Sequence, residues 1–153
     1  MRIIRPMRFV PRKPLPHHVP AWVEGASLYF FTVCARPPGT TNLIRPESAK
    51  PILSATEHYH VSGRWHIRIL LLMPDHLHAL AAFPSIEEMR NVWRDWKRFT
   101  AKVARVEWQR DFFEHRLRNE ESWEEKAAYI RANPVRKGLV TRPEDWRWVY
   151  PAP

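Results

Sequence analysis

Apolar residues recur along this chain with two different periods, and segments of the two kinds alternate. Some segments are rich in aromatic and β-branched residues or alternate apolar with polar positions, which predicts strands. These are residues 28–34, 65–73, 76–83 and 112–117. Others place apolar residues at three- and four-residue steps or begin with a capping sequence, which predicts helices. These are residues 46–60, residues 86–105 and a segment that opens at Ser122. This order of elements predicts a single α+β domain with a mainly antiparallel sheet packed against helices.

Two prolines define the ends of these elements more closely. Pro74 and Asp75 separate two of the strands by a short turn, so an antiparallel hairpin is expected there. Pro134 directly follows Asn133, and the residue before a proline disfavours helical geometry. The last helix should therefore end or kink close to Asn133.

The predicted helix over 86–105 carries two stripes of opposite character. Its apolar stripe is expected to face the core. That stripe consists of Ile86, Met89, Val92, Trp93, Trp96, Phe99 and Val103. Its basic stripe consists of Arg90, Arg94, Arg98 and Lys102. Neighbouring like charges cost an isolated helix roughly a few tenths of a kcal/mol per pair. A nucleic-acid phosphate backbone would offset this repulsion, and an ordinary solvated helix face is the alternative.

The composition adds a strong positive charge. The 153 residues include 25 Lys and Arg against 16 Asp and Glu, giving a formal charge of +9 that favours a polyanionic partner. The apolar runs are far too short to span a bilayer, so no membrane association is predicted. The single cysteine, Cys34, excludes an intramolecular disulfide and fits a reducing cytoplasm.

The first 21 residues differ from the rest because they combine basic residues with several prolines. We predict an extended basic arm over residues 1–21, followed by one domain over residues 22–153. The arm is either a solvated tail or a segment that contacts nucleic acid.

Two histidines, His76 and His78, lie two positions apart on a predicted strand. Side chains alternate along a strand, so both imidazoles point to the same face and can bind one divalent cation together. A structural role is the alternative. A second pair, His58 and His60, falls on a predicted helix, where residues two apart diverge by roughly 200° and cannot chelate in the same way.

Downstream, Tyr129 and Asn133 are four residues apart on a predicted helix and share one face of it. A phenol with a pKa of about 10 is a poor nucleophile unless its target is polarised, and a metal ion bound to a phosphoryl oxygen could do this. Asn133 could complete the metal coordination. The alternatives are a packed tyrosine and a simple helix-end asparagine.

Taken together, these motifs resemble those of the REP-associated tyrosine transposases, a branch of the single-tyrosine HUH transposases of bacteria and archaea. The matching blocks are residues 29–33, 72–78, 93–99, 108–118, 129–140 and 145–148. They fall in family order across nearly all of the chain after the arm, which itself matches no feature of the family.

The resemblance implies an HUH endonuclease domain with a ferredoxin-like arrangement. It implies that His76 and His78 bind Mg²⁺ or Mn²⁺ with Asn133 as the third ligand, and that Tyr129 is the nucleophile. Such enzymes cleave one strand at a DNA hairpin, form a 5′-phosphotyrosine, free a 3′-hydroxyl and later reseal. The expected partner is hairpin or single-stranded DNA, and the protein is expected to be a monomer or homodimer. The expected DNA-backbone contacts are Arg90, Arg94, Arg98, Lys102, Arg110, Arg116 and Arg118.

Two other functions fit the same residues. One is a non-catalytic, domesticated protein that binds DNA hairpins through its basic surface. The other is a metal-dependent RNA nuclease or RNA-binding module, which would release hydrolysed products without a protein adduct.

Overall fold

The computed structural model describes residues 19–118 and 122–153, so the expectation for residues 1–18 of the basic arm lies outside the described residues. The strands are β1 (Leu28–Arg36), β2 (His66–Leu72), β3 (His76–Ala82), β4 (Glu107–Trp108), β5 (Phe113–Arg116) and β6 (Val149–Tyr150). The helices are α1 (Pro46–Val61), α2 (Ile86–Ala104), α3 (Trp123–Arg131) and α4 (Asn133–Arg136). Short 3₁₀ helices are η1 (Ala21–Val23), η2 (Asn42–Ile44) and η3 (Pro143–Asp145).

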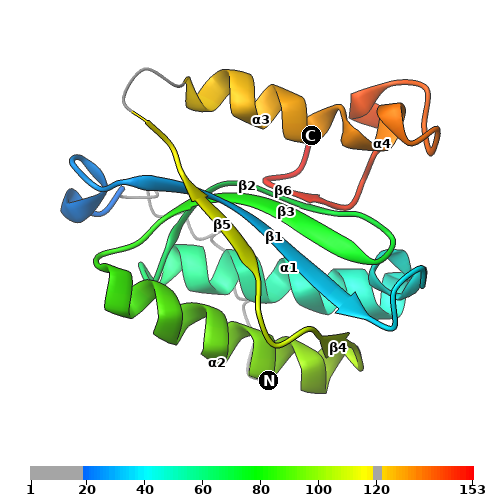
Figure 1. Ribbon diagram of the computed structural model, residues 1–153, viewed down its shortest axis with the longest axis horizontal. Helices are drawn as coiled ribbons and strands as arrows, with labels where there is room; N and C mark the ends of the chain where they lie inside the picture. Colours follow the sequence, from blue (N-terminus) through cyan, green and yellow to red (C-terminus); the bar gives the residue numbers. More distant parts are fainter. Residues whose placement is uncertain (1–18, 119–121) are drawn as a thin grey trace, which may run out of the picture.

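The strands form one six-stranded sheet in the order β4-β1-β3-β2-β6, and β5 pairs with the first part of β1. Every pairing is antiparallel. Helices α1 and α2 cover one face of the sheet, and α3 and α4 lie over the other (Figure 1). The predicted α+β domain with a mainly antiparallel sheet is therefore confirmed, as is the hairpin between β2 and β3.

The alternation of side chains along β1 and β3 divides the apolar residues into two cores. Phe31 and Leu77 belong to the larger core, which includes Trp65 just before β2 and side chains of α1 and α2 such as Trp93. Leu80, on the opposite face, packs in a smaller core with side chains of β2 and α3. The sheet is thus buried on both faces, which explains why β2 is almost wholly apolar.

Helix α2 begins at an N-cap, Ser85, whose side chain accepts a hydrogen bond from the Glu88 N–H. The expectation that its whole apolar stripe is core is wrong at three positions, because Ile86, Phe99 and Val103 are 58%, 48% and 40% exposed. Thr100 and Ala104 are buried instead. Successive helix residues differ by about 100°, so Phe99 and Val103, one residue off this buried line, turn toward solvent.

The helix that carries Tyr129 behaves as its sequence predicts at both ends. The Ser122 side chain accepts a hydrogen bond from the Glu125 N–H at the start of α3. Helix α3 ends at Arg131, and α4 begins at Asn133, immediately before Pro134. The predicted break near Asn133 is confirmed.

Strands β4 and β6 were not predicted from the sequence. Each has only two residues and pairs along the edge of a longer strand, β1 or β2. Two residues are too few to show any period. In the part of the chain that the structure describes, no helix combines the length and the apolar character that crossing a bilayer requires.

The helical pair His58 and His60 and the nearby His66 have structural surroundings. His60 accepts a hydrogen bond from the Ile67 N–H, and its ring lies 4.9 Å from that of the buried His66. His58, on the same helix, lines a hollow between α1 and α2 together with Phe99. The two helical histidines therefore point to different places. Burial, with smaller contributions from His60 and Arg68, lowers the pKa of His66 to about 4.

This shift makes stability depend on pH. Between about pH 6.5 and about pH 4 the unfolded chain binds a proton at His66 that the folded chain does not, so the free energy of unfolding falls as pH drops through this window. We expect His66→Gln to remove about 2 kcal/mol of that decrease. Chemical denaturation of the unaltered protein and of His66→Gln, above and below this pH window, measures the two changes in the free energy of unfolding. Identical pH dependence in the two would contradict this role.

Candidate functional site

His76 and His78 lie on β3, on the sheet face that α3 covers. The register of β1 and β3 pairs His76 with Cys34 and His78 with Thr32. Leu80 continues the same face into the smaller core beneath α3, whereas Leu77 belongs to the larger core on the other side. The two imidazoles therefore lie side by side, with ring centroids 4.8 Å apart.

Each of these imidazoles has its Nδ1 atom occupied. The Nδ1 of His76 lies 2.7 Å from the Asp75 carboxylate, and the Nδ1 of His78 lies 3.0 Å from the Thr32 hydroxyl. The Gly39 N–H donates to the second oxygen of Asp75 at 3.0 Å. Partners of this kind fix the orientation of a histidine ring and direct Nε2 toward a ligand, as in many metal sites.

Burial keeps His78 neutral, and a hydrogen bond keeps the Asp75 carboxyl ionised. Burial, aided by His76 and Arg136, lowers the pKa of His78 to about 4, against the opposing effect of a hydrogen bond with the Phe31 backbone. His78 is therefore neutral at pH 7, as a metal ligand must be. The hydrogen bond with His76 holds the pKa of Asp75 below its ordinary value.

The donor set fits a divalent cation. Two imidazoles that present Nε2 on one face suit Mn²⁺ better than Mg²⁺, which prefers oxygen ligands. No group of three or more His, Cys, Asp or Glu side chains able to hold a metal exists among residues 19–118 and 122–153. A third protein ligand would therefore be an amide such as Asn133.

Helix α3 brings Tyr129 over this face. Ala127 and Ile130 are buried in the smaller core, and Tyr129 on the same helix is 57% exposed. The Lys126 ammonium lies 5.1 Å from the Phe30 ring and 5.8 Å from the Tyr129 ring. Phe30 in turn stacks on His78, with ring centroids 5.5 Å apart. A continuous series of contacts thus links the helix to the histidine pair.

Arg136 joins Tyr129 and Asn133, and sequence analysis assigned it no role. Its guanidinium carbon lies 3.9 Å from the centre of the Tyr129 ring. One guanidinium nitrogen donates to the Tyr129 carbonyl at 2.9 Å and to the Asn133 side-chain oxygen at 2.8 Å. Its spacing of three residues from Asn133, within α4, is the signal that could have linked it to that side chain.

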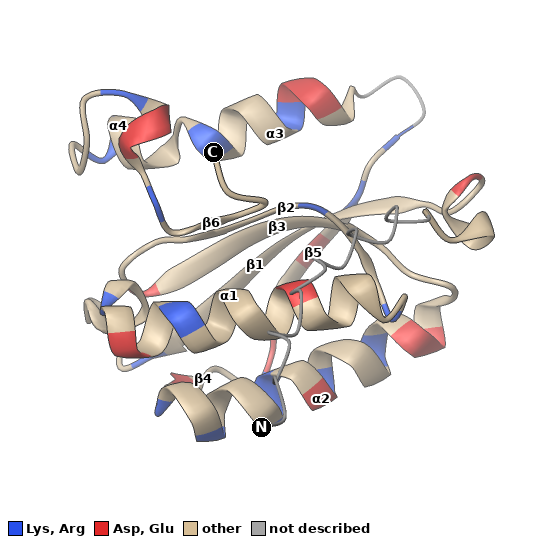
Figure 2. Cartoon of the chain, turned by 180° about the vertical axis from the view of Figure 1, so that it is seen from behind, with Lys and Arg blue, Asp and Glu red and all other residues tan. Residues whose placement is uncertain are grey.

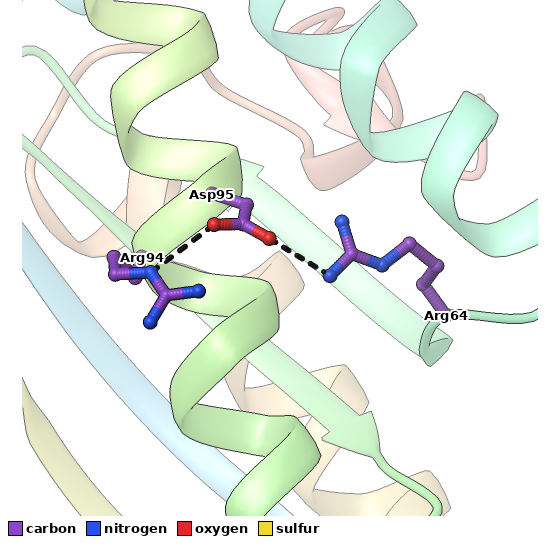
Figure 3. Close-up of polar contacts among 3 residues, drawn as sticks. All are labelled: Arg64, Arg94 and Asp95. Atoms are coloured by element: carbon purple, nitrogen blue, oxygen red, sulfur yellow. Dashed lines mark hydrogen bonds and ion pairs between the residues drawn. The ribbon is translucent and has the colours of Figure 1, made fainter.

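The predicted basic stripe lies elsewhere. Helix α2 covers the sheet face opposite α3, so Arg90, Arg94, Arg98 and Lys102 lie on the layer opposite Tyr129 (Figure 2). Figure 3 shows that Arg94 donates to the Asp95 carboxylate, which also accepts a hydrogen bond from Arg64, at 3.1 and 3.0 Å. At least one member of the stripe thus has a carboxylate partner within the protein.

The three other predicted DNA contacts lie just before, at the end of and just after β5. Arg110 is exposed between β4 and β5, where its carbonyl accepts a hydrogen bond from the Lys97 ammonium. Arg116 ends β5 and is exposed, and Arg118 follows it. Arg116 and Arg118 line a shared hollow near the start of β1.

Comparison with known proteins gives two sequence relatives and one structural neighbour. No protein-family model matches the chain. Over 85 residues it is 28% identical to a REP-associated tyrosine transposase of Escherichia coli strain K12, a match that covers 54% of this chain and 52% of the relative. It therefore spans about half the length of that relative. Over 138 residues it is 25% identical to a Haemophilus influenzae protein assigned provisionally to the same group, covering 78% of this chain and 76% of that one.

The structural neighbour is a REP-associated tyrosine transposase bound to a REP hairpin. The superposition has a TM-score of 0.69 at 24% sequence identity and covers 81% of this chain and 76% of that chain. At this identity the likeness establishes the fold.

The Thr32–His78 hydrogen bond provides a direct test of the histidine pair. We expect Thr32→Val, which removes the hydroxyl and keeps the side-chain shape, to weaken Mn²⁺ binding by about 10- to 100-fold, because ring orientation is lost. Titration followed by the electron paramagnetic resonance signal of free Mn²⁺ measures the affinity. The exposed Thr141→Val is the matched control. Equal affinities in the two variants would count against a metal at His78.

Proposed function

We propose, from the relation of this chain in sequence and fold to the REP-associated tyrosine transposases, that it binds hairpin DNA and cleaves and rejoins one strand through Tyr129. The proposed metal ligands are His76, His78 and Asn133, and the proposed cofactor is a divalent metal ion, Mg²⁺ or Mn²⁺. The proximity of the two imidazoles on β3 supports the choice of His76 and His78 as ligands.

The observation that carries the proposal is the placement of a tyrosine-bearing helix over a histidine pair. Ala127 and Ile130 fix α3 against the sheet face that presents His76 and His78, and Tyr129 remains exposed to a substrate. A packed structural tyrosine would be buried instead.

The reaction we propose is an in-line displacement at phosphorus. The Tyr129 phenol oxygen forms a bond to phosphorus, and the bond from phosphorus to the 3′-oxygen breaks. The phenol gives up a proton and the released 3′-oxygen takes one up, so a 3′-hydroxyl leaves and a 5′-phosphotyrosine remains. Attack by a second 3′-hydroxyl reverses the step and rejoins DNA. Because the tyrosyl phosphodiester conserves the bond energy, no ATP is required.

The residues of this chain have separate tasks in that step. The divalent metal, when bound, would neutralise charge on the phosphoryl group and orient it. Thr32 and Asp75 hold the two imidazoles in place. Arg136 fixes the Tyr129 ring and places a cation beside it, where it can also attract a phosphate. The Asn133 oxygen has a second lone pair besides the one that Arg136 uses.

A covalent adduct is the decisive product. Incubated with hairpin DNA and Mn²⁺ or Mg²⁺, the protein should form a species that survives denaturing electrophoresis and carries both DNA and protein. Tyr129→Phe should abolish it because the nucleophile is gone, and His78→Ala should reduce it strongly because a ligand is lost. Lys137→Ala, an exposed neighbour on the same segment, is the control.

Each other result selects a different function. Tight hairpin binding with no adduct would identify a non-catalytic DNA-binding protein, and an adduct that persists in Tyr129→Phe would exclude this residue as the nucleophile. Cleaved RNA without an adduct would support the nuclease alternative.

Arg136 allows a second prediction. We expect Arg136→Ala to slow adduct formation by about 10- to 100-fold, because small displacements of a reacting group have effects of this size. Arg136→Lys keeps the charge and should restore part of the rate. Single-turnover kinetics at saturating DNA distinguishes a slower rate of adduct formation from weaker DNA binding. A change confined to DNA affinity would show that Arg136 does not position Tyr129.

A further inference from the structure

Lys126 lies on α3 three residues before Tyr129, a spacing at which two side chains share one face of a helix. Its ammonium lies 5.8 Å from the centre of the Tyr129 ring and 5.1 Å from the centre of the Phe30 ring. Phe30 belongs to β1 and stacks on His78. The ammonium therefore lies where the helix that carries the proposed nucleophile meets the side chains beside the histidine pair.

Among the described residues, the Lys126 ammonium has no partner of opposite charge, although its side chain is half-buried. Within residues 19–118 and 122–153, no acceptor takes a hydrogen bond from it. The faces of the two rings attract the cation but leave its three N–H donors without acceptors. A partly buried charge without a counter-charge is costly. The position therefore suits an anion that a substrate supplies.

Arg136, the other cation at the Tyr129 ring, is used differently. One of its nitrogens donates to the Tyr129 carbonyl and to the Asn133 side-chain oxygen. These hydrogen bonds hold the ring and the end of the helix in place. Arg136 thus acts on the position of Tyr129, whereas the donors of Lys126 are available to a substrate.

A phosphate attacked by Tyr129 would lie close to this ammonium. The proposed reaction places the phosphorus atom between the phenol oxygen and the histidine pair, and Lys126 contacts a ring on each side of that position, Tyr129 and Phe30. A phosphodiester has two non-bridging oxygens, so a metal ion at the histidines and an ammonium on α3 can each hold one. Cations fixed at a transferring phosphoryl group stabilise the transition state more than the ground state.

We propose that Lys126 is a catalytic residue whose ammonium donates a hydrogen bond to a non-bridging oxygen of the phosphate that Tyr129 attacks. The bonds that form and break are those of the proposed reaction, and the ammonium keeps its own protons throughout. This inference rests on the proposed function, because it concerns the same site.

Single-turnover rates of adduct formation, at saturating concentrations of a hairpin DNA, test this role. We expect Lys126→Met, which keeps an apolar stem and removes the charge, to slow the reaction about 100-fold, the effect of losing one donor to the transition state. Lys126→Arg keeps a cation and should retain part of the rate. Lys50→Met removes an exposed lysine on α1 and should leave the rate unchanged.

A hairpin with a methylphosphonate at the cleaved position separates a contact with charge from a structural role. This linkage carries no negative charge, so the missing cation should matter little on it. We expect Lys126→Met and the unaltered protein to form the adduct at similar rates with this substrate. A variant whose helix had shifted would instead be slowed equally on both substrates, and that result would overturn the proposal.

The outcomes separate this inference from the proposed function. An adduct that forms equally fast with Lys126→Met and with the unaltered protein on the phosphodiester hairpin would reject only the role of Lys126. Absence of an adduct with the unaltered protein would reject the proposed chemistry, and the role of Lys126 with it.

Discussion

The antiparallel pairing of β1 with β3 fixes both the core and the candidate site. Because side chains alternate, the register that places Phe31 and Leu77 in the larger core also places Thr32 opposite His78 on the other face. A slip of one residue would exchange the faces, so that the imidazoles would enter the larger apolar core and Leu77 would move to the face that α3 covers. The cost of burying those polar groups makes the register strongly specified. The hydrogen bond between Thr32 and His78 is thus a consequence of the same packing that stabilises the fold.

The second constraint is the short helix that closes the histidine face. With nine residues, α3 is too short to be stable alone, so its position comes from Ala127 and Ile130 in the smaller core. Those two contacts determine where Tyr129 lies. Pro134 removes an amide donor and ends the regular helix, and the turn that follows brings Arg136 back onto the Tyr129 carbonyl and ring. The break in the helix therefore contributes to the arrangement of the site.

Local sequence rules predicted the long elements well, since the strands at 28–36 and 76–82 and the helix at 86–104 have strong periods and clear caps. Contacts that depend on the whole fold were harder to predict from the sequence. The exposure of Phe99 and Val103 depends on how α1 and α2 are rotated against each other. The edge strands β4 and β6 form because they pair with the longer strands β1 and β2. Sequence spacing predicted that His76 lies beside His78 and that Tyr129 lies near Asn133. Only the tertiary structure shows that α3 packs against the sheet face that carries the two histidines.

The basic stripe of α2 shows why charge patterns need a structure. Four like charges at helical spacing repel by roughly 0.2–0.5 kcal/mol per neighbouring pair, and a phosphate backbone is one way to offset this. The structure supplies another way to offset the repulsion, because Asp95 accepts hydrogen bonds from both Arg94 and Arg64. Such partly exposed ion pairs contribute about 0–1 kcal/mol each, enough to match the repulsion. The stripe can therefore persist without DNA, and its distance from Tyr129 across the sheet makes it weaker support for DNA binding than Arg116 and Arg118, which line a hollow near the start of β1.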